Sequence, residues 1–194
     1  MRAQAFSLEA FVASLLVLSG VIFALQMTAV TPLSASTSNQ HIGNQQRAAA
    51  AGVLDAAAAN GTLSEAVVYW NTTEEEFDRS GDGTYNNGGP PNAFCRALNE
   101  TFGSQRTAFD IRISWYGANR TDRDSTPMVD MGTPSDDAVV VTRTVVLYDD
   151  TRLSARSTGT VGSAAANETF YAPDVSLADR LFNVVEVRIV VWRI

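Results

Sequence analysis

Residues 10–30 read AFVASLLVLSGVIFALQMTAV, and no charged residue occurs between Glu9 and Arg47. A helix over residues 5–25 would rise about 31 Å at 1.5 Å per residue, close to the roughly 30 Å hydrocarbon thickness of a bilayer. This stretch predicts an N-terminal helix that crosses a membrane once. Arg2 before the stretch favours an N-terminus on the inside and the remaining chain on the outside.

The charged residues are unbalanced in type as well as in number. The chain has 194 residues, with 21 Asp and Glu, 14 basic residues that are all Arg, and a formal net charge of -7. An acidic protein without lysine suits concentrated salt, where the Debye length shortens to about 3 Å at 1 M. A GC-rich genome, which replaces Lys with Arg, is the alternative explanation. No basic patch is present to neutralise phosphates, so no nucleic-acid partner is expected.

Two features divide the chain after the apolar stretch. Pro32 is expected to kink the helix because proline removes a backbone hydrogen bond. The alanine-rich residues 47–59 favour a further helical part, with Asn60 and Gly61 as its end. The predicted organisation is a leader or cytoplasmic tip over 1–5, a transmembrane helix over 6–31, a continuing helix packed on the head over 32–60, and an extracellular head over 61–194.

The head is expected to combine a mainly antiparallel sheet with one short helix. Phe94, Leu98 and Phe102 recur every four residues and predict that helix, opened near Asn92 and closed by Gly103. Alternating, β-branched or aromatic residues predict strands over 65–70, 107–116 and 138–150, the last two paired with each other. Residues 117–136 are predicted to be a loop, and 184–194 a central strand covered on both faces. The predicted class is α+β, with a long kinked N-terminal helix, half in the membrane and half on the head.

The residues around the start of the apolar stretch carry a family pattern. Arg2-Ala3-Gln4-Ala5-Phe6-Ser7-Leu8-Glu9 precedes the stretch, and Pro32 follows it. This pattern resembles the N-terminus of type IV prepilins and pseudopilins. Together with the acidic, lysine-free composition, it is similar to uncharacterised pilin-like membrane proteins of halophilic archaea.

The resemblance implies processing and assembly. A prepilin peptidase would cut after Ala3, as in archaeal class III signal peptides, or after Ala5, so that Gln4 or Phe6 begins the mature chain. Glu9 would then be the sixth or the fourth mature residue, and it would pair with the N-terminal amine of a neighbouring subunit. The competing interpretation is a Glu9 that is stabilised only by the helix N-terminus, by about 0.3 to 1 kcal/mol.

Five N-x-T sequons lie in the head and none lies in the apolar stretch. They predict N-glycosylation of an exported domain, although at least two are expected to serve only as turns or caps. Their asparagines are Asn60, Asn71, Asn99, Asn119 and Asn167.

A possible metal site lies in the first long loop of the head. Asp78, Ser80 and Asp82 place oxygen atoms at alternate positions, as in the first half of a calcium loop. Position twelve of that loop is Gly89 and not a bidentate acid, so a solvated glycine-rich loop is the competing interpretation. No other cofactor is predicted.

No catalytic residue is predicted. Cys95 and His41 are the single Cys and the single His, so the chain forms no internal disulfide and has no zinc-type ligand spacing. The sequence also has no nucleotide-binding loop and no nucleophile elbow. We therefore expect a protein that is not an enzyme.

The features together favour a non-catalytic, membrane-anchored, pilin-like or pseudopilin-like surface subunit that forms filaments through its helix. Its expected partners are membrane lipid, other pilin-like subunits, and the prepilin peptidase and assembly machinery. The first alternative is an uncleaved single-pass membrane protein whose extracellular head binds a ligand or partner. The second is a secreted protein released by cleavage near Ala35.

Overall fold

The computed structural model describes residues 2–103, 106–154 and 156–194, without the side chains of residues 2–8 and 26–39. It divides into two compact units, Met1–Ile42 and Gly43–Ile194. Helix α1, Arg2–Ala59, runs through the boundary between them. Each unit is described by itself below.

Helix α1 is not the expected kinked helix. Its helical backbone continues from Arg2 to Ala59 with no interruption at Pro32, so the prediction of a long kinked N-terminal helix is wrong. A proline inside a helix costs about 3 kcal/mol. This cost does not end α1, whose helical backbone continues on both sides of the proline.

The predicted membrane half of α1 is likewise not found. Within the parts of the chain that the structure describes, none of the helices combines the length and the apolar character required to span a bilayer.

The unit Gly43–Ile194 has more helices than predicted. Helix α3, Ala93–Phe102, confirms the expected helix: the Asn92 side chain accepts a hydrogen bond from the Cys95 amide at 2.9 Å and caps it. Helices α2, Thr62–Val67, and α4, Val161–Ala166, were not expected. Helix α2 replaces the strand predicted over 65–70, because Leu63, Ala66 and Val67 fall on one helical face and are buried.

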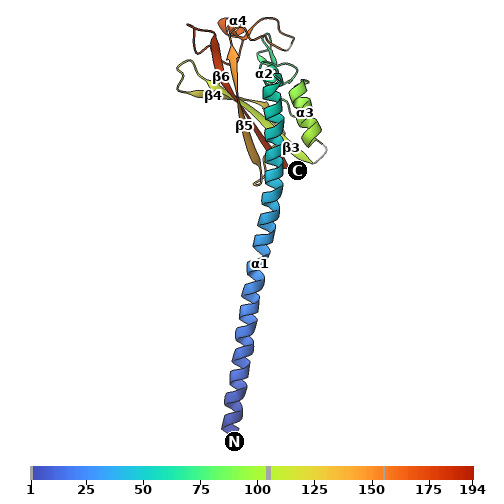
Figure 1. Cartoon of the computed structure of the whole chain (residues 1–194), viewed down its shortest axis with the longest axis vertical. Coiled ribbons are helices and arrows are strands. Elements are labelled where there is room, and N and C mark those ends of the chain that lie inside the picture. Colours follow the sequence, from blue (N-terminus) through green and yellow to red (C-terminus); the bar gives the residue numbers. More distant parts are fainter. Residues whose placement is uncertain (1, 104–105, 155) are drawn as a thin grey trace. The chain divides into compact units, whose positions relative to one another are not determined.

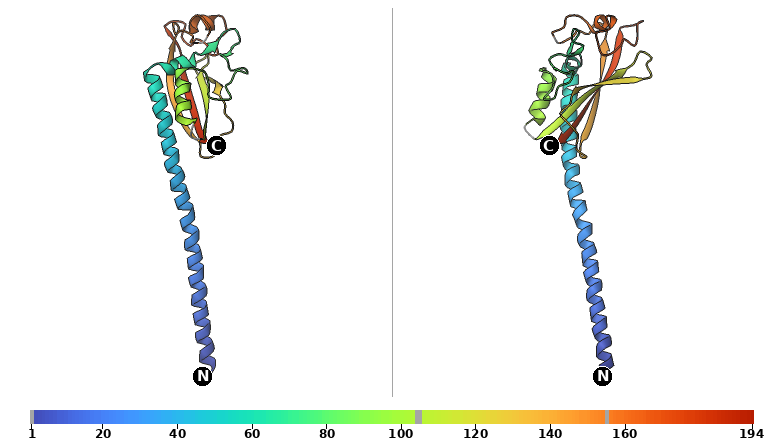
Figure 2. Two further views of the ribbon diagram at one scale, coloured as in Figure 1. Left: turned by 90° about the vertical axis from the view of Figure 1, so that its right-hand side faces the viewer. Right: turned by 180° about the vertical axis from the view of Figure 1, so that it is seen from behind.

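The main sheet is antiparallel, with strand order β4-β3-β6-β5. A separate two-stranded sheet pairs β1, Trp70–Asn71, with β2, Glu76–Phe77. Figure 1 shows α4 and the C-terminus at opposite ends of the main sheet. In Figure 2 the red strand β6 runs between its two partners. The strands of the main sheet are β3 (Thr107–Tyr116), β4 (Arg123–Val129), β5 (Val139–Tyr148) and β6 (Leu181–Arg193).

The main sheet confirms the predicted central strand, β6, and corrects three other predictions. Ile189 lies opposite Ile111 of β3 and Val141 of β5, so β5 pairs with β6 and not with β3. Ile189 is buried whereas Arg188 is exposed, so the middle of the strand is covered on one face only. Strand β4 occupies part of the predicted loop over 117–136, because pairing with β3 supplies backbone hydrogen bonds to a polar segment.

One hydrophobic core joins the covered face of the sheet to the helices of this unit. Burying each large apolar side chain contributes about 1.5 to 3 kcal/mol. The core therefore holds the segments that carry the sequons in place. Its buried members include Ala50 and Leu54 of α1, Leu63 of α2, Leu98 of α3, Phe109 and Ile111 of β3, and Ile189 of β6.

Candidate functional site

Aromatic side chains hold the two-stranded sheet of β1 and β2 against residues 169–171. The rings of Trp70 and Phe77 meet edge to face with centroids 5.2 Å apart, and Tyr171 lies at the same distance from Trp70. Trp70 Nε1 donates to the Thr169 carbonyl at 2.7 Å, and the Tyr171 hydroxyl donates to the Val67 carbonyl at 3.0 Å. Such aromatic pairs contribute about 0.5 to 1.5 kcal/mol each beyond their burial. They bind β1 and β2 to the distant segment 169–171.

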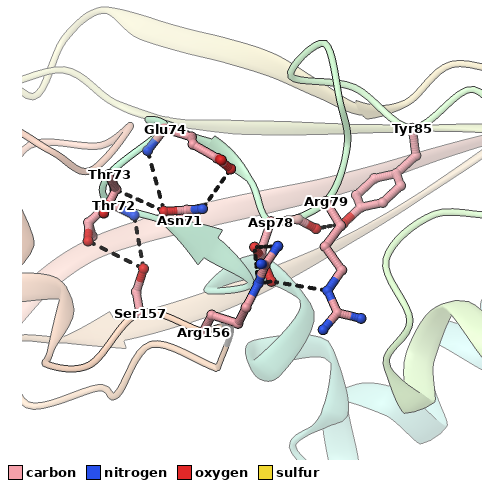
Figure 3. Close-up of polar contacts among 9 residues, drawn as sticks. All are labelled: Asn71, Thr72, Thr73, Glu74, Asp78, Arg79, Tyr85, Arg156 and Ser157. Atoms are coloured by element: carbon pink, nitrogen blue, oxygen red, sulfur yellow. Dashed lines mark hydrogen bonds and ion pairs between the residues drawn. The ribbon is translucent and has the colours of Figure 1, made fainter.

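Asp78, the residue that directly follows β2, is a buried carboxylate (Figure 3). Arg156 Nη2 lies 2.9 Å from Asp78 Oδ1, and Arg156 Nε donates to the two carboxylate oxygens at 3.1 and 3.2 Å. Arg79 Nε lies 3.8 Å from Asp78 Oδ2. The Tyr85 hydroxyl donates to the Asp78 carbonyl, and burial raises the pKa of Tyr85 above its usual value, so this donor stays protonated. The carboxylate is thus neutralised within the fold.

The three candidate calcium ligands do not converge. Asp78 faces Arg156, Asp82 is exposed, and the buried Ser80 hydroxyl has no hydrogen-bond partner among the described atoms. A calcium ion at Asp78 would have to displace a guanidinium group and then lie beside it. In the described ranges, no group of three or more acidic, His or Cys side chains is arranged to hold a metal.

The five sequon asparagines have different surroundings. Asn71 is half-buried, and the other four are exposed. In four of them the side-chain nitrogen Nδ2 donates a hydrogen bond within the fold. Its acceptors are Glu74 Oε2 for Asn71 at 2.7 Å, the Gly88 carbonyl for Asn99 at 2.9 Å, Asp122 Oδ2 for Asn119, and the Ser163 carbonyl for Asn167 at 2.8 Å. Asn60 differs, since the described residues offer its Nδ2 no acceptor, while its Oδ1 accepts from Thr62.

The second candidate region is residues 10–25 of α1, called the apolar segment below. All its side chains are exposed, and the large ones are between 48% and 70% exposed. The Ser14 hydroxyl is satisfied by the Phe11 carbonyl at 2.8 Å, and a Cβ atom on Gly20 would meet nothing within 4 Å. The large members are Phe11, Val12, Leu15, Leu16, Val17, Leu18, Val21, Ile22, Phe23 and Leu25.

The residues expected to act in leader processing are only partly described. Glu9 is exposed at the start of the apolar segment. The side chains of Ala3, Gln4, Ala5, Phe6 and Pro32 lie outside the described residues.

The comparisons with known proteins bear on the whole chain. The model of a family described as a family of unknown function, DUF7288, matches residues 2–191. The chain belongs to the DUF7288 family. No curated protein and no solved structure matches it. The match covers nearly all of both units.

In this DUF7288 chain, two contributors to the Asp78 site could not be expected from the sequence. Arg156 and Ser157 come from a loop about eighty residues downstream, where Ser157 Oγ accepts a hydrogen bond from the Thr72 amide at 2.9 Å (Figure 3). All the basic residues are Arg, so nothing in the composition singles out Arg156. The single thiol is not a nucleophile at neutral pH, since burial raises the pKa of Cys95 to about 12.

Proposed function

We propose that the chain is a non-catalytic, pilin-like subunit of the cell surface that assembles through its apolar segment. The observation that carries this proposal is the exposure of large apolar side chains around the whole helix. Helices that are apolar on all sides are normally buried. Since burial of each such side chain contributes about 1.5 to 3 kcal/mol, a surface of this kind strongly favours association.

Other copies of the same chain are the partner that the segment fits best. No charge occurs between Glu9 and Arg47, so identical segments lying side by side experience no like-charge repulsion there. Small residues allow close approach of two helix backbones. The segment contains Ala13, Ser14, Ser19, Gly20 and Ala24. Before assembly, membrane lipid covers the segment, with the sheet-bearing unit on the outer side.

Gly20 offers a direct test of assembly. Gly20→Leu adds a large side chain where the isolated chain has open space, so it disturbs contacts between copies without disturbing the fold of one copy. The full chain would be purified in mild detergent, and assembly would be followed by light scattering and electron microscopy after the detergent is removed. We expect filaments or large oligomers for the natural chain and a marked loss for Gly20→Leu.

A matched control comes from the other unit. Leu177 is 91% exposed on a loop there, so Leu177→Ser removes an exposed apolar side chain outside the apolar segment. This variant should assemble like the natural chain. A natural chain that stays monomeric, or a Gly20→Leu chain that assembles normally, would contradict the proposal.

Leader removal and the role of Glu9 form a separate part of the proposal. Mass spectrometry of the mature protein should find an N-terminus at Gln4 or Phe6, and Glu9→Ala should reduce assembly by removing the partner of that new amine. A mature chain that begins at Met1 or Arg2 would refute processing, while the Gly20 experiment would still decide assembly.

A further inference from the structure

We propose that Asn60 is the sequon asparagine that carries an N-linked glycan, attached through its Nδ2 atom. The inference rests on the proposed function in one respect, because it requires the unit Gly43–Ile194 to face the outside. It goes further by separating one sequon from four others of identical N-x-T form.

The side-chain nitrogen of Asn60 is free, whereas the nitrogens of the other four are engaged. Nδ2 donates to Glu74 in Asn71, to the Gly88 carbonyl in Asn99, to Asp122 in Asn119 and to the Ser163 carbonyl in Asn167. Each of those four nitrogens keeps a second hydrogen, but its hydrogen bond ties the carboxamide to a loop or a helix end and opposes the rotation that would bring Nδ2 into a transferase site. At Asn60 the described residues place no acceptor on Nδ2, and the residue is exposed.

The hydroxyl of the threonine also distinguishes the Asn60 sequon, although the amides of Thr73 and Thr121 contact the Oδ1 atoms of their own sequon asparagines as the Thr62 amide does. Thr62 Oγ1 donates to Asn60 Oδ1 at 2.7 Å, and the Thr62 amide donates to the same atom at 3.0 Å. Both bonds hold the carboxamide oxygen against the turn and use none of the Nδ2 hydrogens. In contrast, the hydroxyls of Thr101 and Thr169 donate to the Ala97 and Ala164 carbonyls.

Free space adjoins the Asn60 side chain. Asn60 and Thr62 border a groove of about 350 Å³ between α1 and α3, lined on its other sides by small side chains such as Ala56, Ala93 and Ala97. The next residue, Gly61, has a φ of 81° and closes the turn between α1 and α2, with nothing within 4 Å of an added Cβ. The Asn60 side chain therefore lies beside open space on the groove side and at Gly61.

The covalent step is a glycosyl transfer. Asn60 Nδ2 forms a bond to the anomeric carbon of an oligosaccharide carried on a lipid phosphate. The bond from that carbon to the phosphate oxygen breaks, and the lipid phosphate leaves with the electron pair. The proton from Nδ2 passes to a base of the transferase. The hydrogen bond from Thr62 draws electron density toward Oδ1, which makes the Nδ2 proton more acidic.

Glycopeptide mass spectrometry of the full chain tests the assignment in a host that N-glycosylates exported proteins. We expect the highest occupancy at Asn60, complete loss of that glycan in Asn60→Gln and Thr62→Val, and its retention in Thr62→Ser. Asn167→Gln removes another exposed sequon and should leave the Asn60 glycan unchanged. An unmodified Asn60, or an occupancy at Asn60 no higher than at the other sequons, overturns the inference.

A second variant tests whether a hydrogen bond donated by Nδ2 lowers the glycan occupancy of a sequon. Asp122→Ala removes the acceptor of the Asn119 nitrogen, so occupancy at Asn119 should rise about five-fold, the factor expected for one hydrogen bond. Asp124→Ala changes a nearby acid that does not bind Asn119 and should have no such effect. Unchanged glycan occupancy at Asn119 in Asp122→Ala overturns the argument that a hydrogen bond from Nδ2 limits glycan attachment. Assembly measured on the same samples reports separately on the proposed function.

Discussion

Replacing Ile189 with alanine tests whether the C-terminal strand is the structural centre of the unit Gly43–Ile194. Ile189 is fully buried in β6, opposite Ile111 on one side and Val141 on the other. Both neighbouring strands hold β6 by backbone hydrogen bonds, so the backbone cannot move in to fill the space that the substitution leaves.

The size of the effect follows from this position. Ile189→Ala removes about three carbon groups, worth roughly 0.8 kcal/mol each in transfer free energy, or about 2.4 kcal/mol in total. The unfilled cavity raises the expected loss of unfolding free energy to about 3 to 4 kcal/mol. A unit of this size loses about 2 to 4 °C in Tm per kcal/mol, so the Tm should fall by about 10 °C.

Tryptophan fluorescence during heating of the full chain in mild detergent is the appropriate assay. Trp70, Trp115 and Trp192 are all buried in this unit, so the signal reports its unfolding and not events in the apolar segment. Ile194→Ala is the matched control, because Ile194 is 75% exposed at the end of the chain and should change stability by less than about 0.5 kcal/mol. Equal shifts for the two variants would refute the central role of β6.

Three further predictions concern the same unit. Burial raises the pKa of Cys95 to about 12, so the stability from this thiol is complete below the unfolded pKa of about 8.5 and is lost as pH rises toward 12. Cys95→Ala should remove this pH-dependent part of the unfolding free energy, which denaturation curves recorded from about pH 8 to about pH 10 would measure. Gly89→Ala should cost about 1 to 3 kcal/mol more than Gly81→Ala: both glycines have positive φ, but only at Gly89 does an added Cβ come within 2.9 Å of other side chains. Tyr171→Phe should cost about 1 to 3 kcal/mol in thermal unfolding, because the Val67 carbonyl loses its donor, and an unchanged Tm would contradict this.

Several elements could be predicted from the sequence because their signals are local. Helix α3 has its apolar residues at four-residue spacing and a capping asparagine at position 92, and both features act within one or two turns. The alternation in residues 107–116 likewise reports a strand with one buried face. The continuous helicity of α1 was not predicted. The local effect expected of Pro32, a kink, did not determine the backbone conformation at that position.

The tertiary structure decided the features that depend on distant partners. Helix α2 is set by burial of one face, and β4 is set by the hydrogen bonds that β3 supplies. The insertion of β6 between β3 and β5, and the pairing of Asp78 with Arg156, join residues that lie far apart in the chain. The five sequons show the same division: the sequence determined where they are, and the fold decided that only the Asn60 nitrogen has no acceptor among the described residues. Burial and hydrogen-bond partners arise only when separate segments meet, so no local pattern records them.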